Sequence, residues 1–269
     1  MNIPVSTYYK SSESDEKRKL MLEREAATIS LINSLREQWP AYGYRRITAE
    51  LKRRGFAINH KRVARIMREH PVKVRVKRPK YKQKDFGELG AAFPFIARNF
   101  TPTGPDQLWV TDITYIRLRS GFVYLSVMID AWSRKVVGYA ASHRINVRLV
   151  TATLEDAYDI RKPEPGLIHH SDRGAQYLAK SYQLRLSDYG MVGSMSRKGT
   201  PTDNAQAESF MKTLKHEEVY QFGYETVSDV KARLPRFLED VYNRRRIHSA
   251  LGYMTPEEFE IKHAGKRSN

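Results

Sequence analysis

The chain has 269 residues, 41% of them hydrophobic, which provides enough apolar surface for one sizeable core with a smaller module attached. It contains no cysteine, which excludes disulfides, thiol catalysis and any cysteine-containing zinc site. The formal net charge of 47 − 30 = +17 favours a polyanionic partner such as nucleic acid over a neutral small molecule. No apolar run approaches the roughly 18 residues of a membrane span, and residues 1–10 lack the centre of a signal peptide, so we expect a cytoplasmic protein.

The positive charge is concentrated near the N-terminus. Residues 1–84 hold 22 Lys and Arg against 8 Asp and Glu, which gives +14 and leaves 25 − 22 = +3 for residues 85–269. A uniformly solvated surface does not predict so uneven a distribution. The N-terminal module is therefore expected to bind DNA or RNA.

Three helices are predicted in this module. Residues 23–39 carry apolar side chains at helical spacing, residues 44–54 repeat the pattern with Gly55 at the position of a C-terminal cap, and Asn59 can cap a helix over residues 60–69. A helix pair joined by a tight turn, the second helix basic on its open face, is typical of a helix-turn-helix that enters the DNA major groove. A three-helix bundle with a solvated basic face is the alternative.

Basic side chains continue from the third helix into the next segment. Residues 71–84 contain no acidic residue and are interpreted as a phosphate-tracking linker, and the Gly- and Pro-rich run that follows places a domain boundary near residue 100. The expected DNA contacts of this half are Lys61, Arg62, Arg65, Arg68, Lys73, Arg75, Lys77 and Arg78.

From Trp109 the apolar period changes from that of a helix to two. The pattern predicts three strands in hairpin order, then helix, strand, helix and strand, which fold naturally as a mixed α/β sheet covered by helices. The expected ranges are 109–118, 121–130 and 135–142 for the hairpin strands, then 146–160, 166–172, 179–189 and 191–195. Helices over 203–220 and 228–246 complete the chain, the second kinked by Pro235.

Three carboxylates stand out in this half. Asp112 lies inside an apolar strand, Asp172 follows a strand, and Glu208 lies on a helix that Asp203 can cap with Gln206 completing a capping box. Carboxylates from two strands and a helix can converge on two Mg²⁺ ions, which act in phosphoryl transfer. Spacing alone leaves open that Asp112 caps a bulge, Asp172 begins a turn, and Glu208 pairs with Lys212.

Other polar residues of this half have mostly structural interpretations. Asp130 is expected to be a structural acceptor, and His169 and His170 are expected to pack or stack and not to bind metal. A basic cluster near the C-terminus is dense enough to hold phosphates, although a solvated helix end explains it nearly as well. That cluster is Arg244, Arg245, Arg246 and His248.

Four sequence blocks then point to a family. WVTDITYI, HHSDRGAQY, SMSRKGTPTDNAQAESFMKTLKHE and YNRRRIHSALGYMTPEEF resemble the signature blocks of the integrase-core transposases of the insertion-sequence family called IS-three. The spacings 172 − 112 = 60 and 208 − 172 = 36 fit its Asp-Asp-Glu pattern, and Lys215 stands seven residues after the glutamate. The resemblance covers essentially the whole chain.

The resemblance implies a ribonuclease-H-like core, preceded by the helix-turn-helix-like module. It implies that Asp112, Asp172 and Glu208 bind Mg²⁺ or Mn²⁺, two ions in all, and catalyse cleavage and strand transfer at the ends of a mobile element. The chain resembles the second-reading-frame product of such elements, with a first-reading-frame product as fused or separate partner and a homo-oligomer acting on DNA in the nucleoid. An inactive or domesticated DNA-binding regulator and a ribonuclease H are the alternatives.

Helix geometry adds an expectation for Lys215. Seven helical residues are almost two turns, so Lys215 shares a face with Glu208 about 10.5 Å farther along the axis, where an ammonium can hold a DNA phosphate. A solvated lysine paired with Glu218 is the alternative. The expected domains are a helical module over 1–70, a basic linker over 71–100, the catalytic core over 101–222 and a C-terminal helical extension over 223–269.

Overall fold

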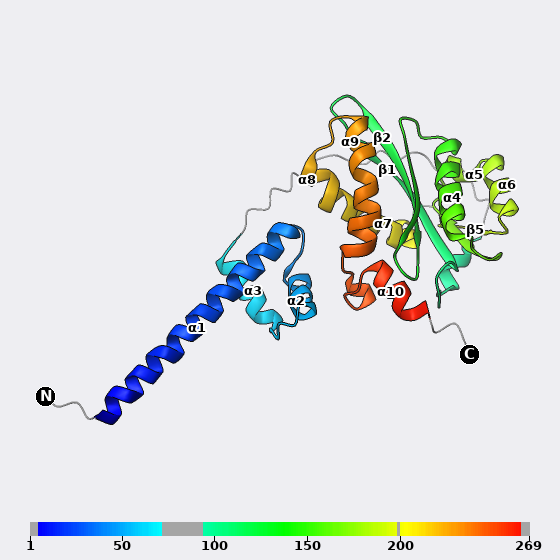
Figure 1. The fold of residues 1–269 in the computed structure, drawn as a ribbon. Helices are drawn as coiled ribbons and strands as arrows, with labels where there is room; N and C mark the ends of the chain where they lie inside the picture. Colours follow the sequence, from blue (N-terminus) through cyan, green and yellow to red (C-terminus); the bar gives the residue numbers. More distant parts are fainter. Residues whose placement is uncertain (1–4, 72–93, 198–199, 265–269) are drawn as a thin grey trace. The chain divides into compact units, whose positions relative to one another are not determined.

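The computed structural model describes residues 5–71, 94–197 and 200–264, with the side chains of residues 5–14, 201 and 202 left undescribed. The fold divides into two compact units, residues 1–75 and residues 76–269, and each is considered by itself (Figure 1). The linker residues expected to contact DNA lie outside the described residues: Lys73, Arg75, Lys77 and Arg78.

The N-terminal unit contains three helices, α1 (Val5–Gln38), α2 (Tyr44–Arg53) and α3 (His60–Glu69). The second and third agree with the sequence prediction. Gly55 ends α2 with a φ of 85°, a conformation that costs little only for glycine. Asn59 caps α3 by accepting a hydrogen bond from the Lys61 N–H. The helices pack around a small apolar core made of Ile32, Leu35, Tyr42, Ile47, Leu51, Val63 and Ile66.

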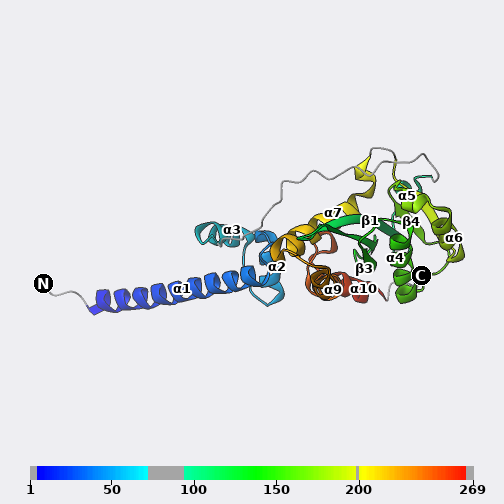
Figure 2. The ribbon, with the colours of Figure 1, turned by 90° about the horizontal axis from the view of Figure 1, so that it is seen from above.

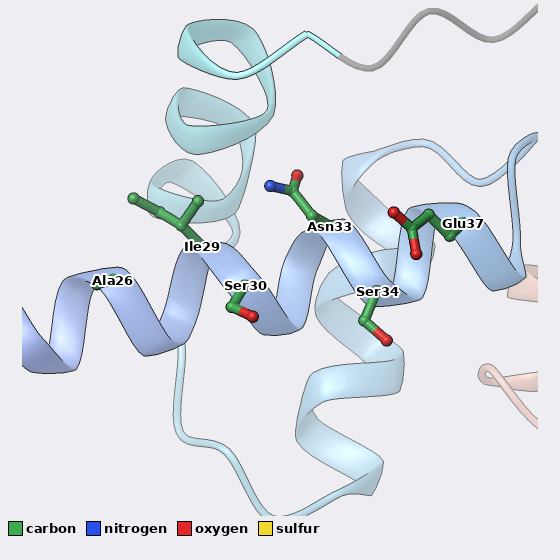
Figure 3. A pocket seen from close by; sticks show the side chains of 6 residues that line it. All are labelled: Ala26, Ile29, Ser30, Asn33, Ser34 and Glu37. Atoms are coloured by element: carbon green, nitrogen blue, oxygen red, sulfur yellow. The ribbon is translucent and has the colours of Figure 1, made fainter.

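Helix α1 begins at Val5, well before the predicted start at residue 23. The prediction was wrong there because it relied on a buried apolar stripe, and Leu20, Met21 and Leu22 in the added length are exposed. Farther along α1, Figure 3 shows a shallow groove whose lining side chains all come from successive turns of this helix. It holds none of the candidate site residues and is lined by Ala26, Ile29, Ser30, Asn33, Ser34 and Glu37.

The second unit is built on one five-stranded sheet in the order β3-β2-β1-β4-β5. The first three strands are antiparallel neighbours, and β1 pairs with β4 and β4 with β5 in parallel, so the mixed sheet predicted from the sequence is confirmed. The strands are β1 (Leu108–Arg117), β2 (Phe122–Asp130), β3 (Val136–Ser142), β4 (Ile168–Ser171) and β5 (Val192–Met195).

Helices cover both faces of this sheet (Figures 1 and 2). One apolar cluster joins β1 and β2 to α7 (Ala205–Leu214), α9 (Val227–Pro235) and the π-helical segment η4 (Arg236–Arg245). The other cluster, on the opposite face, contains α4 (Val147–Arg161), the short α5 (Ala175–Leu178) and α6 (Lys180–Asp188). The sheet therefore separates two cores, and side chains alternate between them along each strand.

The C-terminal helices belong to the core of this unit. Leu234, Phe237 and Leu238 lie in the expected C-terminal helical extension, residues 223–269, and are buried in the same cluster as β1. At the other end, the short helix η1 (Ile96–Asn99) bonds to β5 through Ala97 N–H and Ser194 Oγ, 3.1 Å apart, so the packed unit starts before residue 101.

Two predicted long helices are each divided. Residues 203–220 become η2 (Pro201–Asn204), α7, the π-helical η3 (Lys215–Val219) and α8 (Tyr220–Phe222). The predicted capping box is absent, since Asn204 occupies the N-cap without a side-chain cap bond and Asp203 binds Arg197 instead. In the other helix the change from α to π geometry falls directly after Pro235, as a helix-disturbing proline suggests. Two short elements close the chain, η5 (Ser249–Leu251) and α10 (Pro256–His263).

No helix in the described part of the chain is both long enough and apolar enough to cross a lipid bilayer.

Candidate active site

Asp112 occupies the middle of the central strand β1, where it pairs across the sheet with Val127. Its side chain is partly buried, and its Oδ1 accepts a hydrogen bond from the Ile113 N–H at 2.8 Å. Strand β4 pairs only with Leu108 to Val110 of β1, so Asp112 lies just beyond the point where that neighbour ends. Ligand sites in open sheets gather where neighbouring strands end.

Asp172 and Glu208 reach the same region from other elements. Asp172 directly follows β4, the parallel neighbour of β1, and its Oδ1 accepts from the Gly174 N–H at 3.0 Å. Glu208 lies in the first turn of α7, which begins beside β1 because the Asn204 amide donates to the Thr111 carbonyl at 2.9 Å. One end of α7 is thereby attached next to Asp112.

The pKa of Asp112 depends on the charges of the other two carboxylates. The pKa of Asp112 is raised to about 7, by burial first and then by the negative charges of Asp172 and Glu208, while the Ile113 hydrogen bond and the positive charge of Lys215 act to lower it. Like charges brought together in this way favour the protonated acid. The structure thus brings all four residues into one electrostatic group.

The carboxylates do not enclose a common point in this arrangement. In the parts of the chain that the structure describes, no set of three or more His, Cys, Asp or Glu side chains is close enough to hold a metal ion. Glu208 Oε2 lies 3.7 Å from Lys212 Nζ, which is the pairing given by the alternative interpretation, and Asp172 is turned to the Gly174 N–H. Because the carboxylates repel one another, Glu208 and Asp172 are each stabilised by interacting with a local partner.

Lys215 follows the last residue of α7 and begins the π-helical segment. Its Nζ lies 4.8 Å from the centre of the Tyr115 ring on β1. Burial lowers the pKa of Lys215, and the charge of Asp112 acts in the opposite direction. The alternative pairing with Glu218 is not what the structure shows, because Glu218 binds Arg233 Nε at 3.1 Å.

The structural roles expected for Asp130, His169 and His170 are confirmed. Asp130 is buried and accepts from the N–H groups of Ser133 and Asp106 at 2.7 Å each. His169 hydrogen-bonds to the Tyr182 hydroxyl, and His170 lies between the hydroxyls of two serines, Ser194 and Ser196. Burial lowers the pKa of His169 to about 3 and that of His170 to about 4, so both are neutral near pH 7.

The C-terminal basic cluster is divided between core and surface. Arg246 is 3% exposed and binds both oxygens of Glu217 at 2.7 Å, with the buried His248 beside it. The expected phosphate contact is therefore not supported for Arg246 or His248, because a buried arginine already held by a carboxylate is closed to a phosphate. Arg244 and Arg245 remain at the surface, paired with Glu257 and Asp240.

The basic face of α3 is open to solvent. Lys61, Arg62, Arg65 and Arg68 are all exposed. Arg65 is partly neutralised by Glu25 of α1, 2.9 Å away, and by Glu69. Between α1 and α3 lies a groove that adds further cations to this face, lined by Lys17, Leu20, Met21, Arg24, Glu25, Arg62 and Arg65.

Sequence reasoning missed two residues of the site, Tyr115 and Asn204. Tyr115 stands three residues after Asp112, and strand alternation alone would assign the two to opposite faces. The sequence pattern placed Asn204 next to Asp203, which was the expected helix cap, so Asn204 was given no role. The only signal for either was its closeness to a candidate acid along the chain.

Comparison with known proteins identifies the class and the family. Models described as "Integrase core domain" match residues 102–201 and 189–256, and one described as "HTH-like domain" matches residues 23–80. The transposase for insertion sequence element IS904 of Lactococcus lactis subsp. lactis is 38% identical over 245 residues, covering 90% of this chain and 96% of that protein. Transposase InsF for insertion sequence IS3A of Escherichia coli K12 is 37% identical over 223 residues, covering 82% and 77%.

Solved structures with a similar chain trace include two retroviral integrase cores. The catalytic core domain of BIV integrase has a TM-score of 0.46 at 19% identity, covering 60% of this chain and 98% of that one. The HTLV-2 integrase catalytic core, solved in a complex with magnesium, has a TM-score of 0.45 at 14% identity, covering 60% and 98%.

The integrase-core matches and the mixed sheet define a ribonuclease-H-like nucleotidyl-transfer enzyme that acts on DNA. Within that class, the chain belongs to the IS3-family insertion-sequence transposases.

Proposed function

We propose that this transposase cleaves and joins DNA at the ends of an insertion sequence, with Asp112, Asp172 and Glu208 as its catalytic and metal-binding carboxylates. The observation that carries the proposal is the placement of Asp172 directly after β4 and of Glu208 in the first turn of α7, near enough to Asp112 on β1 for their charges to raise its pKa. A strand acid that only capped a bulge would have no reason to lie among two further acids. Groups so perturbed cluster at functional sites.

The donor set fits a divalent cation. All three side chains offer carboxylate oxygen, the ligand that Mg²⁺ and Mn²⁺ prefer, and a cation among them would relieve the repulsion that now raises the pKa of Asp112. Two bound ions would supply an activated attacking oxygen and stabilisation of the leaving oxygen. For the three carboxylates to bind a common cation, Glu208 must give up its ion pair with Lys212, and Asp172 its hydrogen bond from Gly174. Both interactions lie at the surface.

Lys215 is assigned to DNA positioning in this proposal. Its ammonium acts on Asp112 from the first residue of η3, so a phosphate that it held would lie near the acids. An ammonium offers a compact charge for a phosphate oxygen and cannot act as a carboxylate-type metal ligand.

DNA binding outside the catalytic unit is assigned to the exposed cations of α3, Lys61, Arg62, Arg65 and Arg68, and to the basic segment that follows them. A homo-oligomer on DNA and a first-reading-frame partner, fused or separate, complete the proposal. A ribonuclease H and an inactive DNA-binding regulator are not favoured, because the matching relatives are insertion-sequence transposases along 82% or more of this chain.

The proposal is tested with a labelled duplex carrying the terminal sequence of the element, a supercoiled target plasmid and Mn²⁺. Wild type is expected to give strand-transfer products. Asp112→Asn, Asp172→Asn and Glu208→Gln should each abolish them, at least about a thousandfold, while leaving folding and duplex binding nearly unchanged, because each removes a metal-ligand charge and keeps the side-chain volume.

Lys212→Gln is the matched control, since it removes the present surface partner of Glu208 and no carboxylate. It should retain strand transfer. Near-normal products from any one of the three acid variants would remove that residue from the assignment, and degradation of an RNA–DNA hybrid without strand transfer would favour the ribonuclease alternative.

A further inference from the structure

Tyr115 and Lys215 form a contact that the proposed catalytic group does not account for. The Lys215 Nζ lies 4.8 Å from the centre of the Tyr115 ring, within the range of a cation–π interaction. The two residues come from different elements, since β1 carries the tyrosine and the lysine is the first residue of η3, which continues α7. The attraction therefore joins the helix that bears Glu208 to the strand that bears Asp112.

The Tyr115 ring is itself held in place by neighbours on the sheet. Phe122 meets it edge to face, with ring centres 5.5 Å apart and planes at 89°, and Tyr124 is its cross-strand partner. Edge-to-face packing presents the ring in a defined orientation. The lysine, in contrast, has a flexible four-carbon stem whose end is free to take several positions unless something selects one.

The pairing of β1 explains how a helix residue reaches this ring. Strand β4 covers β1 only from Leu108 to Val110, so the edge of β1 beyond Thr111 is not paired with β4. The start of α7 is attached there through Asn204, and Lys215 at the far end of α7 meets Tyr115 three residues farther along β1 than Asp112. Helix and strand run along each other between the two contacts.

We infer that Tyr115 is a positioning residue, whose ring face holds the Lys215 ammonium on the Asp112 side of α7 so that the cation meets the DNA phosphate beside the acids. The inference rests on the proposed function for its catalytic consequence and on the contact geometry for its structural part. The contact needs the face of an aromatic ring. Phenylalanine at position 115 should therefore preserve it, and an aliphatic side chain, which has no ring, should not. From the strength of such contacts when partly desolvated, loss of the ring should cost about tenfold in strand transfer.

The structural part is tested without DNA chemistry. Full-length protein labelled with ¹³C at lysine Cε is compared by NMR, with Lys215→Arg identifying the Lys215 signal. The signal should be shifted upfield by the ring current in wild type and in Tyr115→Phe, and should return to the position of an exposed lysine in Tyr115→Leu. An unshifted signal in wild type would overturn the inference even if strand transfer were normal.

The catalytic part is tested by a double-mutant cycle on strand transfer under single-turnover conditions, combining Tyr115→Leu with Lys215→Ala. If Tyr115 acts through the lysine, the double variant should be no slower than Lys215→Ala alone, and Tyr115→Phe should stay within about twofold of wild type. If the two substitutions slowed strand transfer by independent factors, so that the double variant was slower than Lys215→Ala by the full Tyr115→Leu effect, Tyr115 would act by another route. That result would overturn the inference.

Tyr189→Leu is the matched control, because this ring lies at the end of α6 and stacks on Tyr158, and its effect should be the same whether or not Lys215 is present. Failure of the proposed function gives a different pattern, in which wild type makes no strand-transfer product while the wild-type Lys215 signal is still shifted.

Discussion

Asp112 combines two features that make its proton hard to remove. It is partly buried on a central strand, and Asp172 and Glu208 add negative charge, so that its pKa rises from 3.8 to about 7. Because the folded-state pKa lies above the unfolded one, the folded protein binds the proton more tightly. Stability is therefore lost as the pH rises from about 4 to about 7, and it stays lost above 7.

Asp112→Asn should remove this loss. At pH 8 without divalent metal, the variant is expected to be more stable than wild type by about 2–4 kcal/mol, the lower end allowing for the partial exposure of the side chain, and at pH 4 the two should be nearly equal. Urea unfolding at both pH values measures the difference. Asp159→Asn, on the exposed face of α4, is the control and should match wild type at both. Equal stability of Asp112→Asn and wild type at pH 8 would contradict the electrostatic account.

At the scale of elements, α4 packs against the sheet at unusually short range, and Gly138 on β3 makes this possible. A Cβ at Gly138 would lie 2.6 Å from the Ala157 Cβ and 2.7 Å from the Thr153 carbonyl oxygen. Backbone cannot move away as a flexible side chain can. Gly138→Ala should therefore lower the free energy of unfolding by about 2–3 kcal/mol.

Gly104→Ala is the matched change, because its Cβ would meet only the Gln107 side chain at an ordinary 3.5 Å. It is expected to alter stability by less than about 0.5 kcal/mol. Thermal unfolding of both variants is the measurement, and a similar effect of the two would show that α4 can shift away from β3.

The π-helical segments bring a buried ion pair together. Glu217 lies on η3, and Arg246 directly follows η4, where it binds both Glu217 oxygens at 2.7 Å. Removing one partner of a buried pair leaves the other charge uncompensated. Arg246→Ala should therefore cost about 3–5 kcal/mol in unfolding free energy.

Arg244→Ala provides the comparison two residues away. Its side chain is 60% exposed and lies 3.5 Å from Glu257, so the expected cost is below about 1 kcal/mol. Chemical denaturation of the two variants separates them, and if Arg246→Ala were as mild as Arg244→Ala, the buried pair would not be important for the fold.

For the whole molecule, the uneven distribution of charge predicts that the N-terminal part provides most of the nonspecific DNA binding. Residues 1–84 carry +14 of the total +17. Nonspecific duplex binding should weaken steeply with salt, with a log-log slope near −0.9 per phosphate contacted. A fragment beginning at residue 94, which keeps the packing of η1 on β5, should show a much shallower slope.

Fluorescence anisotropy with a duplex of unrelated sequence measures both slopes. Circular dichroism must first show that the fragment retains the helix and sheet content of the second unit. An unchanged slope in a folded fragment would place the nonspecific affinity in the catalytic unit.

Much of this protein could be predicted from the sequence because the relevant signals are local. Apolar period two gave β1 to β3 within one or two residues, Asn59 and Gly55 marked the ends of helices, and the acids stood out because charged groups are costly inside apolar strands. The charge imbalance needed only counting. The spacing of Asp112, Asp172 and Glu208 resembles a family pattern, which made these residues candidates before any geometry was known.

Only the tertiary structure decided what those side chains meet. Arg244 and Arg246 look alike in sequence, yet one is exposed and the other is buried against Glu217, because a helix register set by distant packing chooses between them. The contact of Tyr115 with Lys215 likewise depends on where β4 stops pairing with β1. Local pattern specifies the elements, whereas burial and charge partners are properties of residues far apart in the chain, which no local pattern contains.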